Sequence, residues 1–211
     1  MTRKFKALGL ALFATLALGA VMASAASATE FTAASYPVKY TGTQASTEPH
    51  VFTADTYETT CKDASFSGEA EKTSTTATLT PVYKECTAFG LSATVNMNGC
   101  DYLFHLGAEG NNATVDLVCP AGKDVTITAG GGACVAHIAP FAGKGSVALS
   151  NAELTEPTRK VIKAAADVAN IGASLTDVSS FFCPFGGNTN TATATYTGNL
   201  TLEGSSNIDI G

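Results

Sequence analysis

The chain has 211 residues, and 45% of them are hydrophobic, which is enough to bury a real core. With 18 acidic and 12 basic residues, its formal net charge at pH 7 is −6. An acidic protein lacks the excess of lysine and arginine that neutralises phosphates, so this balance argues against sequence-independent binding to nucleic acids or to anionic membrane surfaces.

The beginning of the chain has the pattern of an export signal. Basic residues are followed by an uncharged run, Ala7–Val21, and then by small residues that fit cleavage after Ala25 or Ala28. The run is too short and too rich in alanine for a membrane span, which needs about 20 strongly apolar residues. We therefore expect residues 1–28 to be a signal peptide and residues 29–211 to be a single secreted β domain, with no membrane span after cleavage. An uncleaved anchor and two small sandwiches are the alternatives.

All the cysteines follow this signal, at positions Cys61, Cys86, Cys100, Cys119, Cys134 and Cys183. An even number of cysteines in an oxidising compartment predicts three disulfides. No C-x-x-C pair occurs and the histidines are scattered, so the spacing does not match a tetrahedral zinc site. We expect no metal and no cofactor.

Alternation of apolar residues with threonine or serine recurs along the chain and predicts strands with one buried and one wet face. The last strand shows the pattern best, because Ala194, Tyr196 and Leu200 share one face and threonines occupy the other. Besides the hairpins described next, strands are expected at Pro37–Thr41, His50–Thr53, Asp124–Ala129, Cys134–Ala139, Ser146–Ser150 and Ala192–Leu202. Glycine-rich loops are expected at Gly130–Gly132 and Gly143–Gly145.

The first expected hairpin surrounds the polar loop Glu71–Thr76. Pairing across this loop places Phe66 opposite Pro81 and, when extended, brings Cys61 opposite Cys86. The inward-facing positions are even-numbered from Phe66 onward, but Cys61 is odd-numbered. A bulge or kink is therefore required near Lys62-Asp63.

The dipeptide Asn98-Gly99 lies between two alternating runs and is a strong signal for a two-residue hairpin turn, because both residues tolerate positive φ. Such a hairpin pairs Met97 with Cys100 and Val95 with Tyr102.

The next hairpin closes across Gly107–Asn112 and pairs Leu106 with Ala113. The same register places Cys100 opposite Cys119, within reach of a disulfide after small adjustment. By elimination, Cys134 pairs with Cys183. Six cysteines allow 15 pairings, so this solution is one of many.

Short strands separated by turns indicate an all-β fold: an antiparallel β-sandwich or a Greek-key-like barrel, braced by disulfides, with at most one short helix. The secondary structure of Arg159–Ile171 is left undecided, because its apolar residues also fit helical spacing.

Several motifs carry a resemblance, namely Cys61-x4-Phe66-Ser67-Gly68, Asn98-Gly99-Cys100-x-Tyr102-x-Phe104, Cys119-Pro120-x-Gly122 and Thr195-Tyr196-Thr197-Gly198. These runs resemble an uncharacterised family of secreted, disulfide-containing β proteins of soil actinobacteria. The resemblance spans most of the chain after the signal. It implies a secreted β domain and no particular activity, substrate or catalytic residue.

The sequence has no G-x-S-x-G motif, and its cysteines are expected to be paired, so nothing indicates nucleophilic hydrolysis. His105 shares a strand face with Asp101, but the two are about 13 Å apart along an extended strand. We interpret His50 and His137 as ordinary surface histidines.

Acidic residues offer only weak signals. Carboxylate pairs for glycoside cleavage can be drawn from Glu69, Glu71, Glu85, Asp101, Glu109 or Asp116, but the sequence brings no two of them together. The oxygens of Glu109, Asn111 and Asn112 suit calcium, although the spacing of an EF-hand loop is absent. A tight aromatic group, Phe181, Phe182 and Phe185, flanks Cys183.

The leading hypothesis is a non-enzymatic binding or structural β domain of the extracellular space or cell envelope. Its partner is unknown; a cell-wall polymer or an extracellular protein is a candidate. The alternatives are a small secreted hydrolase and an exported protease inhibitor that uses the loop Gly107–Asn112.

Overall fold

The computed structural model describes residues 29–45, 48–108, 111–155, 158–178, 183 and 188–211. Within these residues the chain is all-β, and its one helical element is a 3-10 turn at Gly130–Gly132. The residues of the expected signal lie outside this range. The strands are β1 (Phe31–Ala33), β2 (Val38–Gln44), β3 (His50–Ala54), β4 (Tyr57–Ala70), β5 (Thr76–Ala88), β6 (Leu91–Asn96), β7 (Asp101–Leu106), β8 (Asn112–Val118), β9 (Val125–Ala129), β10 (Cys134–Ile138), β11 (Phe141–Thr155), β12 (Thr158–Asp177), β13 (Thr189–Gly204) and β14 (Ile208–Ile210).

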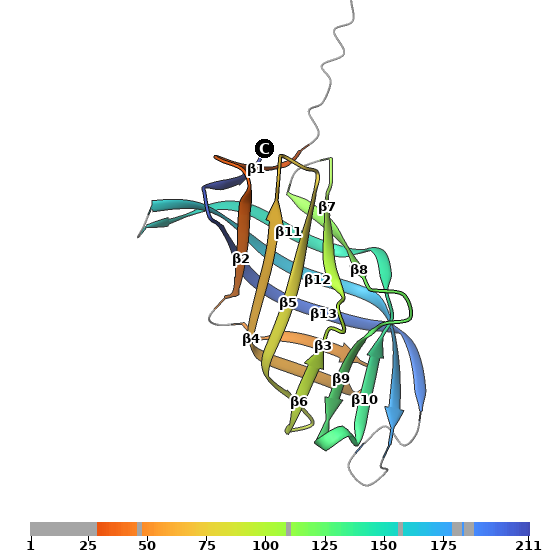
Figure 1. The fold of residues 1–211 in the computed structure, drawn as a ribbon. Coiled ribbons are helices and arrows are strands. Elements are labelled where there is room, and N and C mark those ends of the chain that lie inside the picture. Colours follow the sequence, from red (N-terminus) through yellow and green to blue (C-terminus); the bar gives the residue numbers. More distant parts are fainter. Residues whose placement is uncertain (1–28, 46–47, 109–110, 156–157, 179–182, 184–187) are drawn as a thin grey trace, which may run out of the picture.

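The large sheet closes on itself in two antiparallel rings of strands. One ring runs β5-β7-β8-β11-β12-β13-β2-β4 and returns to β5, and the other runs β5-β6-β9-β10-β12-β13-β3-β4 and also returns to β5. The long strands β4, β5, β12 and β13 belong to both rings, so the rings lie end to end along them (Figure 1). Closure distinguishes the fold from a sandwich of two separate sheets. The short β1 and β14 pair apart from the rings.

Alternation along the strands places one apolar face inside the rings, as the sequence predicts. In β9 the buried residues are Val125, Ile127 and Ala129, while the threonines between them are only partly buried. Buried residues from Phe31 to Ile210 form one continuous hydrophobic cluster. None of the helices in the described part of the chain is long and apolar enough to cross a membrane.

The prediction of a hairpin at Asn98-Gly99 is right about the turn and wrong about the pairing of the strands. The turn itself is present, because Asn98 and Gly99 have positive φ and the amide of Cys100 donates to the carbonyl of Met97 at 2.8 Å. The strands on either side of it do not pair with each other. Instead, β6 pairs with the end of β5, and β7 pairs with the beginning of β5. Together β6 and β7 run back along β5 as one antiparallel partner that is bent at the turn. The kink sends β6 to β9 in one ring and β7 to β8 in the other.

The parity change expected near Lys62-Asp63 is confirmed, and both strands share it. Cys61 and Ala64 are buried with two exposed residues between them, and on β5 the exposed Lys84-Glu85 lies opposite. Glu85 has a φ of 50°, which marks the irregularity. Because both strands break together, the register is the same on both sides of the break.

Two further segments differ from simple strands. Residues 159–171 are part of β12 and not a helix. The register of β12 with β13 shifts between Val168 and Ile171, where Asn170 has a φ of 58°. The expected loop Gly143–Gly145 lies inside β11, where the register with β8 shifts twice. Positive φ at both glycines lets the strand continue through these shifts.

Three disulfides brace the sheet: Cys61–Cys86, Cys100–Cys119 and Cys134–Cys183. These are the pairs that the hairpin registers and elimination predict. The register of β7 with β8 is also the predicted one, with Leu106 opposite Ala113.

Candidate functional site

The interior of the rings contains a cavity of about 70 Å³. Side chains from every strand between β3 and β13 line it, and nearly all of them are aliphatic or aromatic. The cavity exists because small residues, Ala164 and Ala166, face inward on the longest strand, β12. Larger inward side chains at these positions would fill the space, as they do elsewhere in the core.

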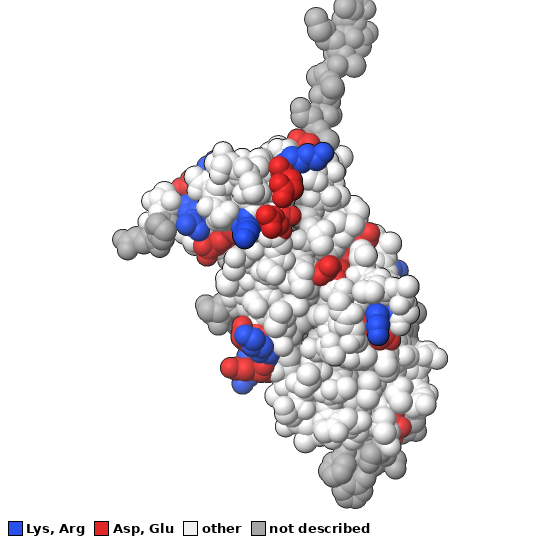
Figure 2. All heavy atoms as spheres, viewed as in Figure 1, with Lys and Arg blue, Asp and Glu red and all other residues white. Residues whose placement is uncertain are grey.

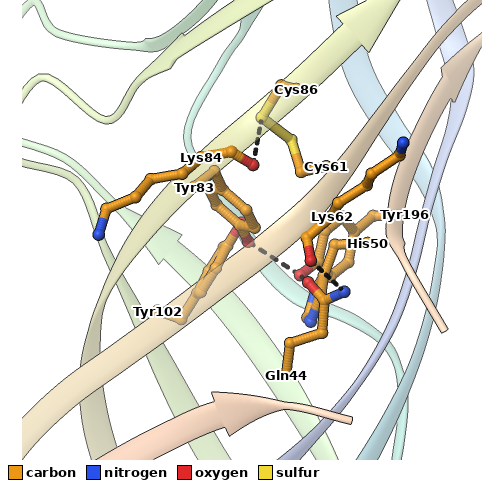
Figure 3. The surroundings of a disulfide bond; sticks show 9 residues. All are labelled: Gln44, His50, Cys61, Lys62, Tyr83, Lys84, Cys86, Tyr102 and Tyr196. Carbon is orange, nitrogen blue, oxygen red and sulfur yellow. Dashed lines mark hydrogen bonds between the residues drawn. A yellow bond between two sulfur atoms is a disulfide. The ribbon is translucent and has the colours of Figure 1, made fainter. Parts of the chain in front are cut away.

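One side of the cavity wall is polar. The Nδ1 atom of His50 lies 2.5 Å from the hydroxyl of Tyr196, which is 2.8 Å from the hydroxyl of Tyr83. The hydroxyl of Tyr83 is in turn 3.1 Å from that of Tyr102. Figure 3 shows these side chains turned toward one another. We call His50, Tyr196, Tyr83 and Tyr102 the polar row.

His50 is the residue that the sequence analysis placed wrongly, since it is buried, with 2% of its surface exposed. Its ring packs 5.6 Å from that of Phe66 and 5.8 Å from that of Tyr196, centroid to centroid. Gly198 makes room for it, because a Cβ at that position would lie 2.2 Å from Nδ1 of His50. The backbone of β13 can therefore approach the imidazole only where the side chain is a hydrogen atom.

The polar row is uncharged at neutral pH. Burial lowers the pKa of His50 to about 4, and the carbonyl of Asn199 offsets only part of this effect. Burial raises the pKa of Tyr83, Tyr102 and Tyr196, and neighbouring tyrosines add to the rise for Tyr83 and Tyr196. Since burial is the largest cause for all three, the surface that these half-buried tyrosines leave accessible faces the cavity rather than bulk solvent.

The two ends of the polar row differ. The hydroxyl of Tyr102 has Tyr83 as its partner, and the side chain lines the cavity. At the other end, Nε2 of His50 is buried and makes no hydrogen bond of normal geometry with any described residue. The open hydrogen-bonding capacity that reaches the cavity is therefore at the Tyr102 end.

The other two histidines bond to aspartates on the outside of the sheet. His105 lies 2.9 Å from Asp116 on the neighbouring strand, whereas the sequence analysis considered only Asp101 and found it too distant. Asp101 instead accepts a hydrogen bond from Thr80. His137 lies 3.0 Å from Asp124, and both side chains are partly exposed, in line with its expected outward position.

The acidic candidates among the described residues do not come together in a cleft. Glu69, Glu71 and Glu85 are exposed. The amide of Gly143 donates to Asp116 and lowers the pKa of its carboxyl, and His105 adds to this effect. In the described part of the chain no cluster of three or more histidine, cysteine, aspartate or glutamate residues is placed to hold a metal. Glu109 and the aromatic group Phe181, Phe182 and Phe185 lie outside the described residues.

The polar row could have been suspected from its tyrosines. Tyr102 and Tyr196 occupy inward positions of alternating strands, and a buried phenol needs a partner for its hydroxyl. No comparable signal marks His50, because its burial depends on pairing with β13, which lies about 145 residues away in sequence.

No known protein family, curated protein or solved structure matches the chain.

Proposed function

We propose that the chain is a non-enzymatic binding domain of the extracellular space or cell envelope that holds a small, uncharged, mainly apolar molecule inside its closed sheet. The observation that carries this proposal is the interior cavity of about 70 Å³, which has apolar walls and one uncharged polar row. Ligand sites of this kind typically combine apolar walls with a few fixed polar groups.

The size of the cavity sets the size of the ligand. An apolar protein cavity of about 150 Å³ stays dry and binds benzene or xenon. The cavity here is about 70 Å³, which suits a molecule of only a few heavy atoms. Most of the side chains around it are buried in tightly paired strands, so the walls favour a ligand that fits without rearrangement.

The electrostatics of the interior suit binding better than acid–base chemistry. A general acid or base works best with a pKa near the operating pH. The pKa of His50 is about 4, and those of the three tyrosines are raised above 10, so the polar row neither takes up nor releases a proton near neutral pH.

The outer surface supports the same proposal. Figure 2 shows that acidic and basic side chains on one face lie beside each other in small groups, with wide uncharged areas between them. No broad field of one sign on this face would attract a charged polymer. The interior is therefore the better candidate for recognition.

The proposed location outside the cytoplasm is supported by the three disulfides, which persist in oxidising compartments. The test is expression of the full chain in a bacterial host, followed by N-terminal sequencing of the exported product. A product beginning at residue 26 or 29 supports the proposal. Retention of the full chain in the cytoplasm with reduced cysteines contradicts it.

Binding is tested with xenon as a probe that requires only apolar space. We expect xenon to shift the methyl NMR signals of the cavity walls in oxidised protein of residues 29–211. The variant Ala166→Leu fills the cavity and should abolish these shifts. Ala165→Leu is the matched control, because Ala165 neighbours Ala166 on β12 but points outward and is exposed.

The outcomes separate clearly. Saturable shifts in the unmodified protein and in Ala165→Leu, but not in Ala166→Leu, support an interior binding site. Shifts that persist in Ala166→Leu, or no shifts in any of the three proteins, contradict it.

A further inference from the structure

We propose that the ligand is a small alcohol: an uncharged, mainly apolar molecule whose one hydroxyl group hydrogen-bonds to Tyr102 at the open end of the polar row. This inference rests on the proposed function, because it names the chemistry of the molecule held in the same cavity.

The number of hydrogen atoms in the polar row leads to this conclusion. Each of the three tyrosines carries one O–H, and a neutral imidazole carries one N–H, so four hydrogens are available. The row has three hydrogen bonds, which join His50 to Tyr196, Tyr196 to Tyr83, and Tyr83 to Tyr102. When the donors run head to tail, one hydrogen is left over, and it lies at one of the two ends.

The head-to-tail order can run in either direction. If His50 donates to Tyr196, the order ends with Tyr102 presenting its O–H to the cavity. If Tyr102 donates toward His50, then Tyr102 presents only oxygen lone pairs and the spare hydrogen lies on Nε2 of His50. The same site therefore offers a donor in one order and an acceptor in the other.

A hydroxyl group is the neutral group that fits both orders, because it donates one hydrogen bond and accepts others. A carbonyl or an ether oxygen fits only the order in which Tyr102 donates. An ionised ligand is excluded by the walls, since burying an unpaired charge among apolar side chains costs several kcal/mol or more. The rest of the ligand faces aliphatic and aromatic groups such as Val115, Leu117 and Ile127, so it is apolar.

The test compares two probes of the same shape. Isobutanol and isopentane differ in one position, where isobutanol has a hydroxyl and isopentane a methyl group. Binding of each is measured by methyl NMR titration of the oxidised protein, with xenon as the probe of apolar space. We expect the ratio of the isobutanol affinity to the isopentane affinity to be about tenfold higher in the unmodified protein than in a variant without the Tyr102 hydroxyl. The cost of taking the alcohol out of water is the same for both proteins and cancels, so the difference measures one hydrogen bond.

The variants identify the hydrogen bond. Tyr102→Phe keeps the ring and removes the hydroxyl, so it should lower the ratio of isobutanol affinity to isopentane affinity about tenfold while xenon still binds. Tyr36→Phe is the matched control, because the hydroxyl of Tyr36 bonds to Thr73 away from the cavity. This control should keep the full preference.

Failure of the inference differs from failure of the proposed function. If xenon binds but the ratio of isobutanol affinity to isopentane affinity is the same in Tyr102→Phe as in the unmodified protein, the alcohol proposal is overturned and an apolar ligand remains. If xenon, isobutanol and isopentane all fail to bind the unmodified protein, the proposed function is overturned as well.

Discussion

Two voids inside the closed sheet share part of their walls and differ in almost every other respect. The smaller, of about 20 Å³, lies under β1 and is lined by apolar side chains alone, including Leu79, Leu149 and Ile162. The larger is the cavity with the polar row, and Phe104, Ala164 and Leu200 line both. Bulky side chains that meet imperfectly explain the smaller void. The larger one instead combines small residues with ordered hydroxyl groups, which is what a binding site requires.

The largest expected effect comes from enlarging the smaller void. Leu79 is 3% exposed, and Leu79→Ala should lower the free energy of unfolding by about 3 to 4 kcal/mol through lost burial and a wider cavity. Urea unfolding measures the loss. Because Leu79 does not line the larger cavity, the affinity for isobutanol should not change under conditions in which the variant is fully folded. If Leu79→Ala lowered both the free energy of unfolding and the affinity for isobutanol, the separation of the two voids would be contradicted.

The second prediction concerns pH and belongs only to the larger cavity. The pKa of His50 is about 4 in the folded protein against 6.5 for an exposed histidine. Below pH 6.5 the unfolded chain therefore takes up a proton that the folded chain refuses. Stability from this group is complete above pH 6.5 and decreases by about 3 kcal/mol as the pH falls to about 4.

The measurement is urea unfolding from pH 7 to pH 4 for the unmodified protein and for His50→Gln. Carboxylates contribute to both proteins, so the difference between the two curves isolates the histidine. We expect the unmodified protein to lose more stability over this range. Parallel curves would show that His50 is not buried as a neutral ring.

Gly198→Ala tests the close approach of β13 to the imidazole. The added Cβ would lie 2.2 Å from Nδ1 of His50, so the ring must move away from Tyr196. We expect a loss of about 2 kcal/mol, typical of overpacking, together with a weaker preference for isobutanol. Gly172→Ala is the control, because a Cβ there has no atom within 4 Å. Equal losses in the two variants would contradict a specific role for Gly198.

The smallest effect is expected for Tyr83→Phe, which removes the middle hydroxyl of the polar row. Two hydrogen bonds are lost while the ring stays, and stability should decrease by about 1 to 2 kcal/mol. Thermal unfolding at pH 7 measures this change. An unchanged melting temperature would indicate that water replaces the hydroxyl.

The sequence predicts local pairing well in this fold. The loop Gly107–Asn112 and the alternating residues on both sides determine the register of β7 with β8, and this register leads directly to Cys100–Cys119. The parity break at Lys62-Asp63 is visible for the same reason: its partner strand follows within 25 residues.

Pairings that depend on competition between strands could not be predicted. Local signals at Asn98-Gly99 favour a hairpin, but β5 is long enough to pair with both β6 and β7, and it does so. The cavity is hidden for a related reason. Ala164 and Ala166 are ordinary strand residues until closure of the rings encloses their small side chains.

The closure of the rings also determines when the fold can be completed. Strand β13 pairs with β2 and β3 from the opposite end of the chain, and it supplies Tyr196 to the polar row. Pairings so distant in sequence form slowly, because the entropy of closing a long loop is lost before the strand contacts contribute any stability. Neither ring exists until β13 arrives, so a chain still being synthesised has no finished cavity. Both rings and the cavity are therefore expected to form together, in the step in which β13 pairs with its neighbours.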